Sequence, residues 1–267
     1  MGIKTFIKKV LRRLAMIRLK RDIKRREKVF TASNGVAVHY YFKPAKGKGD
    51  TLITVFSGFS AIGKPAVYNL VATLKGVRAA RLYILDDFGH EKRGAYYLGE
   101  NGSFAVRDAV LELIESFKMS KNVFCGSSKG GTAAIYFGLL CGADLIVSGA
   151  PQCFIGTYLT AQEDHVPLFD AIAGDHSPEN IEKYDRLLPD LIAAKRSVDK
   201  TVLLMHYSKA EHTYHDHIER MLVCLEENGY RVQHDVATYL HHSDVSKFFP
   251  QFCLAAVRQY LKNQSNV

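Results

Sequence analysis

The chain has 267 residues, 47% of them hydrophobic, a length and composition that suit one large α/β domain better than two small ones. Its formal net charge is +9, and residues 1–28 hold twelve Lys or Arg against two acids, whereas the rest holds 24 basic and 25 acidic residues. A body of balanced charge does not favour nucleic-acid binding. The five cysteines are widely spaced without a Cys-x-x-Cys pair, so no disulfide framework or metal site is predicted.

Residues 1–28 form a basic arm whose apolar residues recur at spacings of three and four, a pattern that predicts an amphipathic helix. These residues are Ile3, Phe6, Ile7, Val10, Leu11, Leu14 and Ile17. Charges interrupt the pattern, so neither a signal peptide nor a membrane span is predicted, and Phe6 does not fit the myristoylation motif. The arm has three candidate uses: contact with the surface of a lipid bilayer, packing on another subunit or on its own body, and binding of an anionic polymer. We expect a cytoplasmic protein, free or peripheral on the inner face of the cytoplasmic membrane.

Residues 29–267 form the expected catalytic domain, and they open with two alternating runs around Asn34-Gly35 that predict a β-hairpin with a turn of type I′. Short apolar runs then alternate with amphipathic stretches, which predicts a mostly parallel sheet with helices on both faces. The expected strands are Leu52–Phe56, Leu82–Leu85, Val123–Cys125, Leu145–Val147, Val202–Met205 and Val232–Tyr239, and the expected helices lie near 65–75, 103–118, 131–141, 178–195, 215–228 and 245–261. The segment 152–198 is longer than a crossover needs, so we expect a lid or cap there.

Gly126-Ser127-Ser128-Lys129-Gly130 matches G-x-S-x-G between an expected strand and an expected helix, the position of a nucleophile elbow. Small neighbours permit the strained backbone that such a serine adopts, and the dipole of the following helix favours the anion formed on attack. Ser128 is therefore the predicted nucleophile. A glycine-rich turn that binds phosphate is the alternative interpretation.

The general base and its acid should follow the nucleophile along the chain in the order acid, then histidine. The last expected strand ends in His241-His242, and we favour His242 as the base because it turns into the loop, with His241 as the reserve. Glu211 follows the preceding strand and would orient the imidazole, with Asp216 as the fallback.

The predicted oxyanion hole combines the N–H of Lys129, next to the nucleophile, with the N–H of Phe59 in the loop after an early strand, where Gly58 permits close approach. The Lys129 side chain is expected either to hold an anionic group of a substrate or to lie exposed on the helix. Asp87 and His90 follow another strand at the same edge and could line the acceptor site or cap loops.

Four segments together resemble a bacterial group of α/β-hydrolase-like proteins that includes capsule O-acetyltransferases and acetyltransferases of accessory secretion systems. They are Phe56-Ser57-Gly58-Phe59, Asp87-Phe88-Gly89 with Gly94-Ala95-Tyr96-Tyr97, Gly126–Gly131, and Gly149-Ala150-Pro151-Gln152. The resemblance implies an α/β-hydrolase fold, acetyl-CoA as acyl donor with no bound cofactor, and a capsular polysaccharide hydroxyl as acceptor. It also makes a capsule assembly at the inner leaflet of the membrane a candidate partner of residues 1–28. It implies Ser128, His242 and Glu211 as the triad, although the capsule enzyme has aspartate at the acid position. A carboxylesterase or deacetylase with the same triad, and a non-catalytic scaffold of a capsule assembly, are the alternatives.

Overall fold

The structure is a computed structural model that describes residues 3–47, 49–195 and 201–264, without the side chains of residues 3, 4, 6–9 and 12. The described strands are β1 (Glu27–Thr31), β2 (Ala37–Lys43), β3 (Thr51–Phe56), β4 (Ala80–Ile84), β5 (Lys121–Ser127), β6 (Leu145–Gly149), β7 (Val202–Ser208) and β8 (Val232–Ala237). The α-helices are α1 (Ile3–Arg26), α2 (Ala105–Glu115), α3 (Lys129–Leu140), α4 (Ile155–Thr160), α5 (Val166–Ala173), α6 (Pro178–Lys195), α7 (Arg220–Glu227) and α8 (Val245–Gln264).

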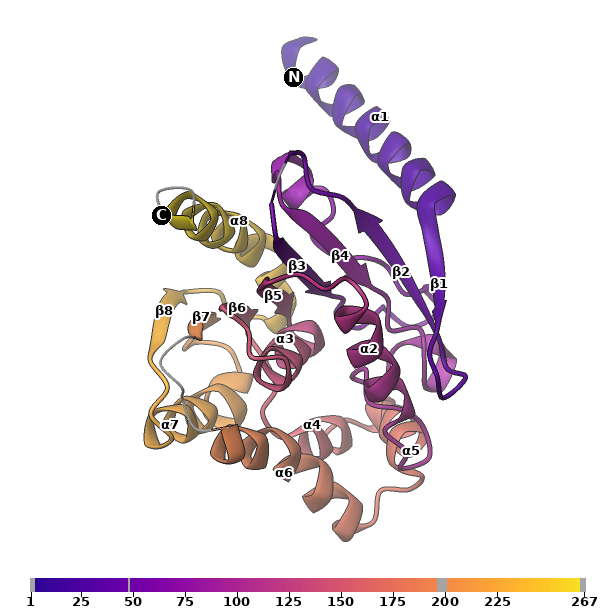
Figure 1. The fold of residues 1–267 in the computed structure, drawn as a ribbon. Coiled ribbons are helices and arrows are strands. Elements are labelled where there is room, and N and C mark those ends of the chain that lie inside the picture. Colours follow the sequence, from indigo (N-terminus) through magenta and orange to yellow (C-terminus); the bar gives the residue numbers. More distant parts are fainter. Residues whose placement is uncertain (1–2, 48, 196–200, 265–267) are drawn as a thin grey trace.

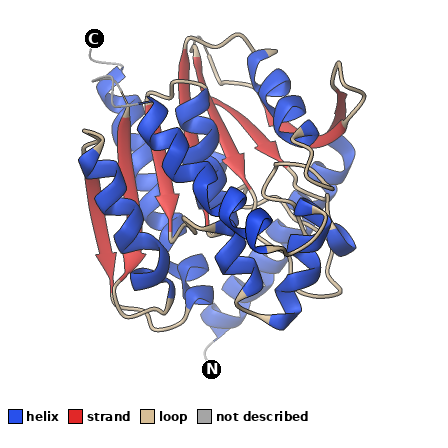
Figure 2. Cartoon of the chain, turned by 90° about the horizontal axis from the view of Figure 1, so that it is seen from below, coloured by secondary structure: helices blue, strands red, loops and turns tan. Residues whose placement is uncertain are grey.

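The strands form one sheet in the order β1-β2-β4-β3-β5-β6-β7-β8 (Figure 1). From β4 to β8 every pairing is parallel, while β2 pairs antiparallel with both β1 and β4. Helices cover both faces of the sheet (Figure 2), so β3, β4 and β6 are buried along their whole length. The predicted mostly parallel sheet with helices on both faces is confirmed.

The predicted N-terminal hairpin is present as β1 and β2, but its turn differs from the expected type I′ turn. Only Gly35 has a positive φ, 82°, whereas both central residues of a type I′ turn need one. The Asn34 side chain instead accepts a hydrogen bond from the Val36 N–H at 3.0 Å and donates one to the Ala105 carbonyl at 2.8 Å. Asn34 therefore fixes the turn through its amide group.

The predicted helix near 65–75 is wrong, because only the 3₁₀ turn Thr73–Gly76 forms there. Leu70 has a φ of 58°, a left-handed conformation that an α-helix of L-residues excludes. Tyr68 donates a hydrogen bond to Glu27 at 2.7 Å, which holds this irregular connection against the start of β1.

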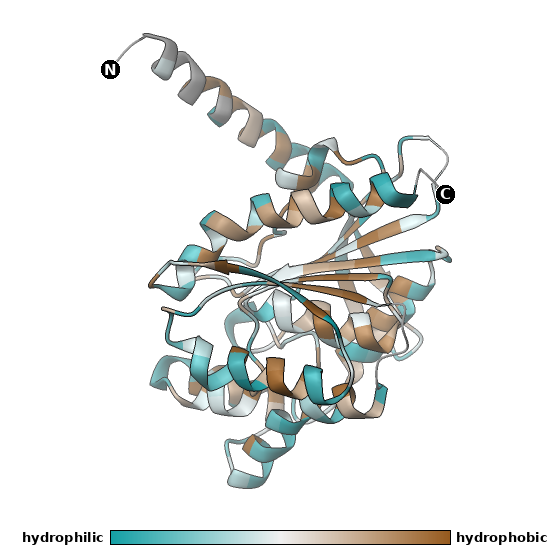
Figure 3. Ribbon diagram, turned by 90° about the vertical axis from the view of Figure 1, so that its left-hand side faces the viewer, coloured by the Kyte–Doolittle hydropathy of each residue, from teal (hydrophilic) through white to brown (hydrophobic). Residues whose placement is uncertain are grey.

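Helix α1 packs on the body through its C-terminal half, where Leu19 and Ile23 contact the hydrophobic core. In the same half, the Asp22 carboxylate accepts hydrogen bonds from Lys43 Nζ at 2.6 Å and from Tyr41 OH at 2.7 Å. The hydrogen bond from Lys43 is the largest of the effects that hold the pKa of Asp22 well below its usual range. The N-terminal half projects past the body (Figures 1 and 3). Among the described helices, none is sufficiently long and apolar to cross a membrane.

Candidate active site

Ser128 occupies a sharp turn between β5 and α3, with φ 56° and ψ −130°. Its N–H donates a hydrogen bond to the Gly149 carbonyl at the end of β6, at 2.7 Å. A Cβ at Gly126 would lie 2.0 Å from the Gly130 carbonyl oxygen, and one at Gly130 would lie 2.5 Å from the Phe56 carbonyl oxygen. Both positions therefore require glycine, and the close packing of three chain segments holds the strained serine in place.

The structure brings Ser128, His242 and Glu211 into one hydrogen-bonded chain. His242 Nε2 lies 2.9 Å from Ser128 Oγ, and His242 Nδ1 lies 2.8 Å from Glu211 Oε2. The Glu211 side chain is fully buried, and its second oxygen accepts a hydrogen bond from Thr213 Oγ1 at 2.7 Å. The buried carboxylate fixes the imidazole with Nδ1 as the protonated nitrogen, which leaves Nε2 free to accept the serine proton.

The reserve residues do not join this chain. His241 is exposed and begins the short turn that carries His242, while Asp216 lies in the π-helical segment Tyr214–Glu219 and makes no hydrogen bond to the imidazole. The geometry therefore favours His242 over His241 and Glu211 over Asp216, and the catalytic roles themselves stay predictions.

The loop after β3 lies beside the nucleophile elbow, as the predicted oxyanion hole requires. A Cβ built on Gly58 would lie 3.6 Å from the Ser127 carbonyl oxygen, so this loop and the end of β5 approach within van der Waals contact. Lys129 is the first residue of α3, and neither its N–H nor that of Phe59 has an acceptor within the described residues. Both amides are thus available to an oxyanion formed next to Ser128.

The two expectations for the Lys129 side chain are both wrong, because this side chain is fully buried. Its ammonium forms an ion pair with Asp86, whose side chain is also fully buried, and it lies 4.8 Å from the ring centre of Tyr97 and 5.2 Å from that of Phe59. Burial lowers the pKa of Lys129, and the Asp86 carboxylate opposes that shift. A Cβ at Gly94, whose φ is 119°, would lie 2.2 Å from the ammonium nitrogen, so glycine is required there. Lys129 is a structural cation.

The buried ion pair connects three loops around the site. Asp86 accepts hydrogen bonds from the N–H groups of Ala95 at 3.0 Å and Tyr97 at 3.1 Å. The Tyr97 hydroxyl accepts a hydrogen bond from the Ser57 N–H at 2.5 Å and donates one to the Ile84 carbonyl at 3.1 Å. Burial raises the pKa of Tyr97 well above its usual value, so the hydroxyl stays protonated. The position of the loop after β3, residues 57–60, therefore depends on these buried polar groups. We call this segment the oxyanion loop after its predicted role.

Asp87 and His90 are not brought to the nucleophile. The Asp87 carboxylate lies 3.0 Å from Nδ1 of His39 on β2, and His90 is exposed in a short 3₁₀ turn. Strand β4 ends at Ile84, and it is Asp86, two residues later, that turns toward the elbow and pairs with Lys129. Neither residue contacts Ser128, and their role in binding an acceptor stays a prediction.

Gln152 is a site residue that the sequence reasoning did not assign. It follows β6, is fully buried, and places Nε2 3.2 Å from Ser128 Oγ and 3.3 Å from His242 Nε2. Its amide oxygen accepts a hydrogen bond from Tyr96 OH at 3.3 Å, and its backbone N–H donates one to Thr132 Oγ1 at 2.9 Å. The side-chain amide thus donates to the reactive oxygen beside the general base.

Replacing Gln152 by alanine is expected to lower kcat about 10- to 100-fold with little effect on KM, because one preorganised polar contact to the reacting serine is lost. Steady-state hydrolysis of an activated acetyl ester measures both constants. Gln251→Ala, at an exposed position on α8, is the matched control. A kcat within twofold of the wild type would show that the Gln152 amide is dispensable.

The segment between β6 and β7 lies against the site through aromatic side chains. The His165 ring stacks on Phe59 of the oxyanion loop at 6.3 Å between ring centres, and Tyr158 on α4 lies 5.9 Å from His165. His217 accepts a hydrogen bond from the Phe154 N–H at 3.3 Å, and burial lowers its pKa to about 4, so its imidazole is neutral at pH 7. The described part of this segment, residues 152–195, therefore packs against the loop that carries Phe59, and its role as a lid stays a prediction.

The fold of this chain recurs in solved structures. The capsule O-acetyltransferase of Neisseria meningitidis serogroup A aligns over 86% of this chain and 93% of its own, with 18% identity and a TM-score of 0.68. The chain is an α/β-hydrolase-fold protein. The glycosylation-associated Gap123 complex of Streptococcus agalactiae aligns with 17% identity and a TM-score of 0.72, over 89% of this chain and 47% of that chain. The predicted fold class is confirmed.

A curated protein also resembles the α/β-hydrolase-fold chain in sequence. It is an accessory Sec system protein of Staphylococcus aureus, which is 27% identical over 230 residues. The match covers 80% of this chain and 42% of that protein, so the chain spans about two fifths of the length of its relative. No family model matches the chain.

Proposed function

We propose that this protein is a serine-dependent acyltransferase that moves acetyl from acetyl-CoA to a hydroxyl of a capsular polysaccharide. The observation that carries the proposal is the hydrogen-bonded chain Ser128–His242–Glu211, which stands beside two unpaired backbone N–H groups at the carboxyl edge of the sheet. Such a constellation activates a serine for attack on an acyl carbonyl carbon.

In the first half-reaction, Ser128 Oγ attacks the thioester carbonyl carbon while His242 Nε2 takes the serine proton. The Phe59 and Lys129 amides hold the negative charge on the carbonyl oxygen. The C–S bond then breaks, His242 returns the proton to the departing sulfur, and acetyl-Ser128 and CoA result. In the second half-reaction, a sugar hydroxyl attacks the carbonyl carbon of acetyl-Ser128 and gives its proton to His242. The bond between the acetyl carbon and Ser128 Oγ then breaks, Oγ takes the proton from His242, and the acetylated sugar leaves.

Two findings support transfer from acetyl-CoA over simple hydrolysis. The serogroup A capsule O-acetyltransferase, which shares the fold over most of both chains, has a histidine variant that was solved in complex with CoA, with a TM-score of 0.69 to this chain. In this chain, the rings of Phe59, Tyr158 and His165 pack on one another next to the loop that approaches the end of β5, and such aromatic cover disfavours water as the acceptor.

Release of CoA from acetyl-CoA tests the proposal when it is followed with and without candidate capsular polymers. Transfer predicts release that rises at least about tenfold with one acceptor, together with acetyl groups on that polymer. Release that is indifferent to every polymer would support a hydrolase with the same triad. If CoA release and ester hydrolysis are both absent in a wild type that folds normally, a non-catalytic scaffold is supported instead.

A further inference from the structure

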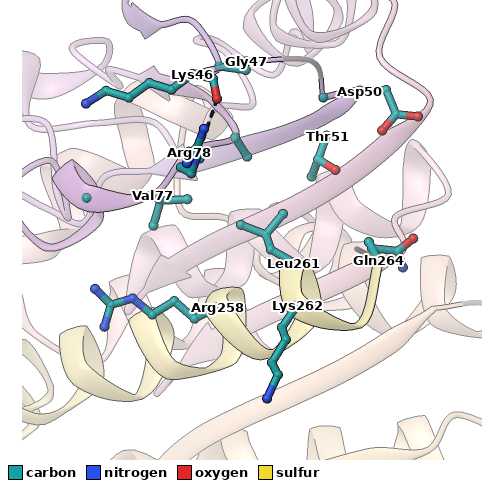
Figure 4. A pocket seen from close by; sticks show the side chains of 14 residues that line it. Lys46, Gly47, Asp50, Thr51, Val77, Arg78, Arg258, Leu261, Lys262 and Gln264 are labelled. Carbon is teal, nitrogen blue, oxygen red and sulfur yellow. Dashed lines mark hydrogen bonds between the residues drawn. The ribbon is translucent and has the colours of Figure 1, made fainter. Parts of the chain in front are cut away.

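The end of the sheet opposite Ser128 carries a concentration of positive charge in two cavities. The larger cavity, about 610 Å³, lies at the amino ends of β3 and β4 against the last turns of α8 (Figure 4). The smaller cavity, about 190 Å³, lies between α1 and the strands β2 and β4. Seven cations line the two cavities and define the basic face: Lys43, Lys46, Lys75, Arg78, Arg81, Arg258 and Lys262.

Six of these seven cations have no carboxylate within ion-pair distance in the described part of the chain, the exception being Lys43, which pairs with Asp22. The two acids that line the cavities are already engaged, because Asp22 binds Lys43 and Tyr41 while Asp50 accepts a hydrogen bond from Ser120. The basic face therefore has a large excess of uncompensated positive charge, which favours an anionic ligand.

Arg81 gives a second and independent indication of an anion at this face. Its side chain is 4% exposed, and its NH1 group donates to the carbonyls of Leu74 at 2.7 Å and Lys75 at 3.1 Å. The Nε–H of the same guanidinium is buried and has no hydrogen-bond partner within the described residues. The Arg81 side chain also lines the smaller cavity. A phosphate oxygen that reached this Nε–H from the cavity would satisfy the donor.

Helix α1 adds exposed apolar surface next to the basic face. Leu19 and Asp22 of its C-terminal half line the smaller cavity, so helix and cavity are contiguous. In the projecting half, Leu11 is 60% exposed and Leu14 is 45% exposed, and Val10, Met16 and Ile17 are also exposed. Arg13, Arg18, Lys20 and Arg21 stand among these apolar residues. An apolar stripe beside cations suits the boundary between lipid headgroups and acyl chains.

We propose that α1 and the basic face together dock on a membrane that contains anionic phospholipid, with headgroup phosphates in the two cavities and the apolar side chains of α1 among the acyl chains. A soluble anionic polymer would use the cations but would leave Leu11 and Leu14 in water. The exposed leucines therefore favour the lipid surface over a polymer.

Docking by this face leaves the catalytic edge open to its substrates. Thr51 at the start of β3 lines the larger cavity, and Phe56 at its end precedes the oxyanion loop, so the length of the strand, roughly 20 Å, separates the two sites. The triad would therefore face away from the lipid surface, and membrane binding is independent of the proposed chemistry.

Co-sedimentation of the full chain with vesicles tests this proposal. Binding to vesicles of phosphatidylcholine with phosphatidylglycerol is expected, with little binding to phosphatidylcholine alone. Arg258→Ala with Lys262→Ala should weaken binding roughly 25-fold, about fivefold for each exposed cation removed. The matched control pairs Arg186→Ala with Lys247→Ala, which removes two exposed cations outside the basic face and should change binding less than about twofold. Equal binding to both vesicle types, or equal losses in the two double variants, would overturn the proposal.

A second variant separates lipid from polymer. Leu11→Ser with Leu14→Ser keeps every charge and should lower vesicle binding at least about tenfold, because the apolar side chains are lost. Its binding to soluble polyphosphate should match that of the wild type. If the variant binds vesicles as tightly as the wild type does, the face recognises charge alone and the lipid proposal fails in favour of a polymer. Ser128→Ala should leave vesicle binding unchanged, so failure of the proposed enzyme activity and failure of docking are distinguishable.

Discussion

Ser128→Ala is expected to lower the rate of acetyl transfer and of ester hydrolysis at least about a thousandfold, and His242→Ala is expected to do the same. The serine oxygen forms the covalent bond, and His242 Nε2, 2.9 Å away, is positioned to remove its proton. The two losses should not add, because each variant abolishes the same step. The rate of the double variant should therefore lie within about tenfold of the rate of either single variant. Rates of hydrolysis of an activated ester at saturating substrate measure all three.

His241→Ala is the matched control for the base, since it removes the neighbouring, exposed imidazole and should change the rate less than about threefold. Glu211→Ala should fall between these extremes, because the acid orients His242 and does not react itself. A larger loss for His241→Ala than for His242→Ala would contradict the geometry of the site. Circular dichroism of each variant separates lost chemistry from lost folding.

Lys129→Met should have the largest effect on stability, lowering the free energy of unfolding by about 3–5 kcal/mol. Both partners of the Lys129–Asp86 pair are fully buried, so removing the ammonium leaves an uncompensated carboxylate in the interior. The same change should displace the loops held by Asp86 and Tyr97. The rate of ester hydrolysis should therefore fall together with the free energy of unfolding. Urea denaturation followed by circular dichroism measures the free energy, because the chain has no Trp whose fluorescence could report unfolding.

Asp86→Asn together with Lys129→Met is the compensating variant. Asparagine keeps an oxygen to accept the Ala95 and Tyr97 N–H groups but carries no charge, so the double variant should regain at least half of the lost stability. A single variant that loses less than about 1 kcal/mol would refute the structural role of the pair. So would a double variant that is no more stable than Lys129→Met.

The order of the elements and the proposed triad were predictable from sequence because each depends on a local pattern. Alternating apolar runs specify the strands, and glycines flank Ser128 because the elbow leaves no room for a Cβ. The histidine and the acid follow from their order along the chain and from the rule that parallel strands end at one edge. These inferences need no knowledge of long-range packing.

The parts that sequence did not predict depend on contacts between distant segments. Lys129 was expected to hold an anionic group of a substrate or to lie exposed at a helix N-terminus, and only the approach of Asp86, 43 positions earlier, explains its burial. Gln152 stood in a motif that supported the resemblance, yet its contact with Ser128 exists only once β5 and β6 are paired. Its place directly after a parallel strand was the signal that could have identified it. The helix predicted near 65–75 does not form because Leu70 has a left-handed backbone conformation, which no residue type in that segment predicts.

The basic face was not predicted from sequence, because its cations come from β2, β4, the loops before β3 and β4, and the last turns of α8. Counting charge along the chain located the excess in residues 1–28 alone. In three dimensions, α1 lies beside four cations of the body, of which only Lys43 pairs with a carboxylate of the described residues, that of Asp22, although the body as a whole is close to neutral.

Labelling with a fluorophosphonate probe, followed by peptide mapping, tests most directly whether Ser128 is the nucleophile of a serine-dependent enzyme. The account predicts one covalent adduct per wild-type chain, located on the peptide that carries Ser128, and no adduct in Ser128→Ala. His242→Ala should label far more slowly, because the serine loses its base. A folded wild type that stays unlabelled, or an adduct on another residue that persists in Ser128→Ala, would contradict it.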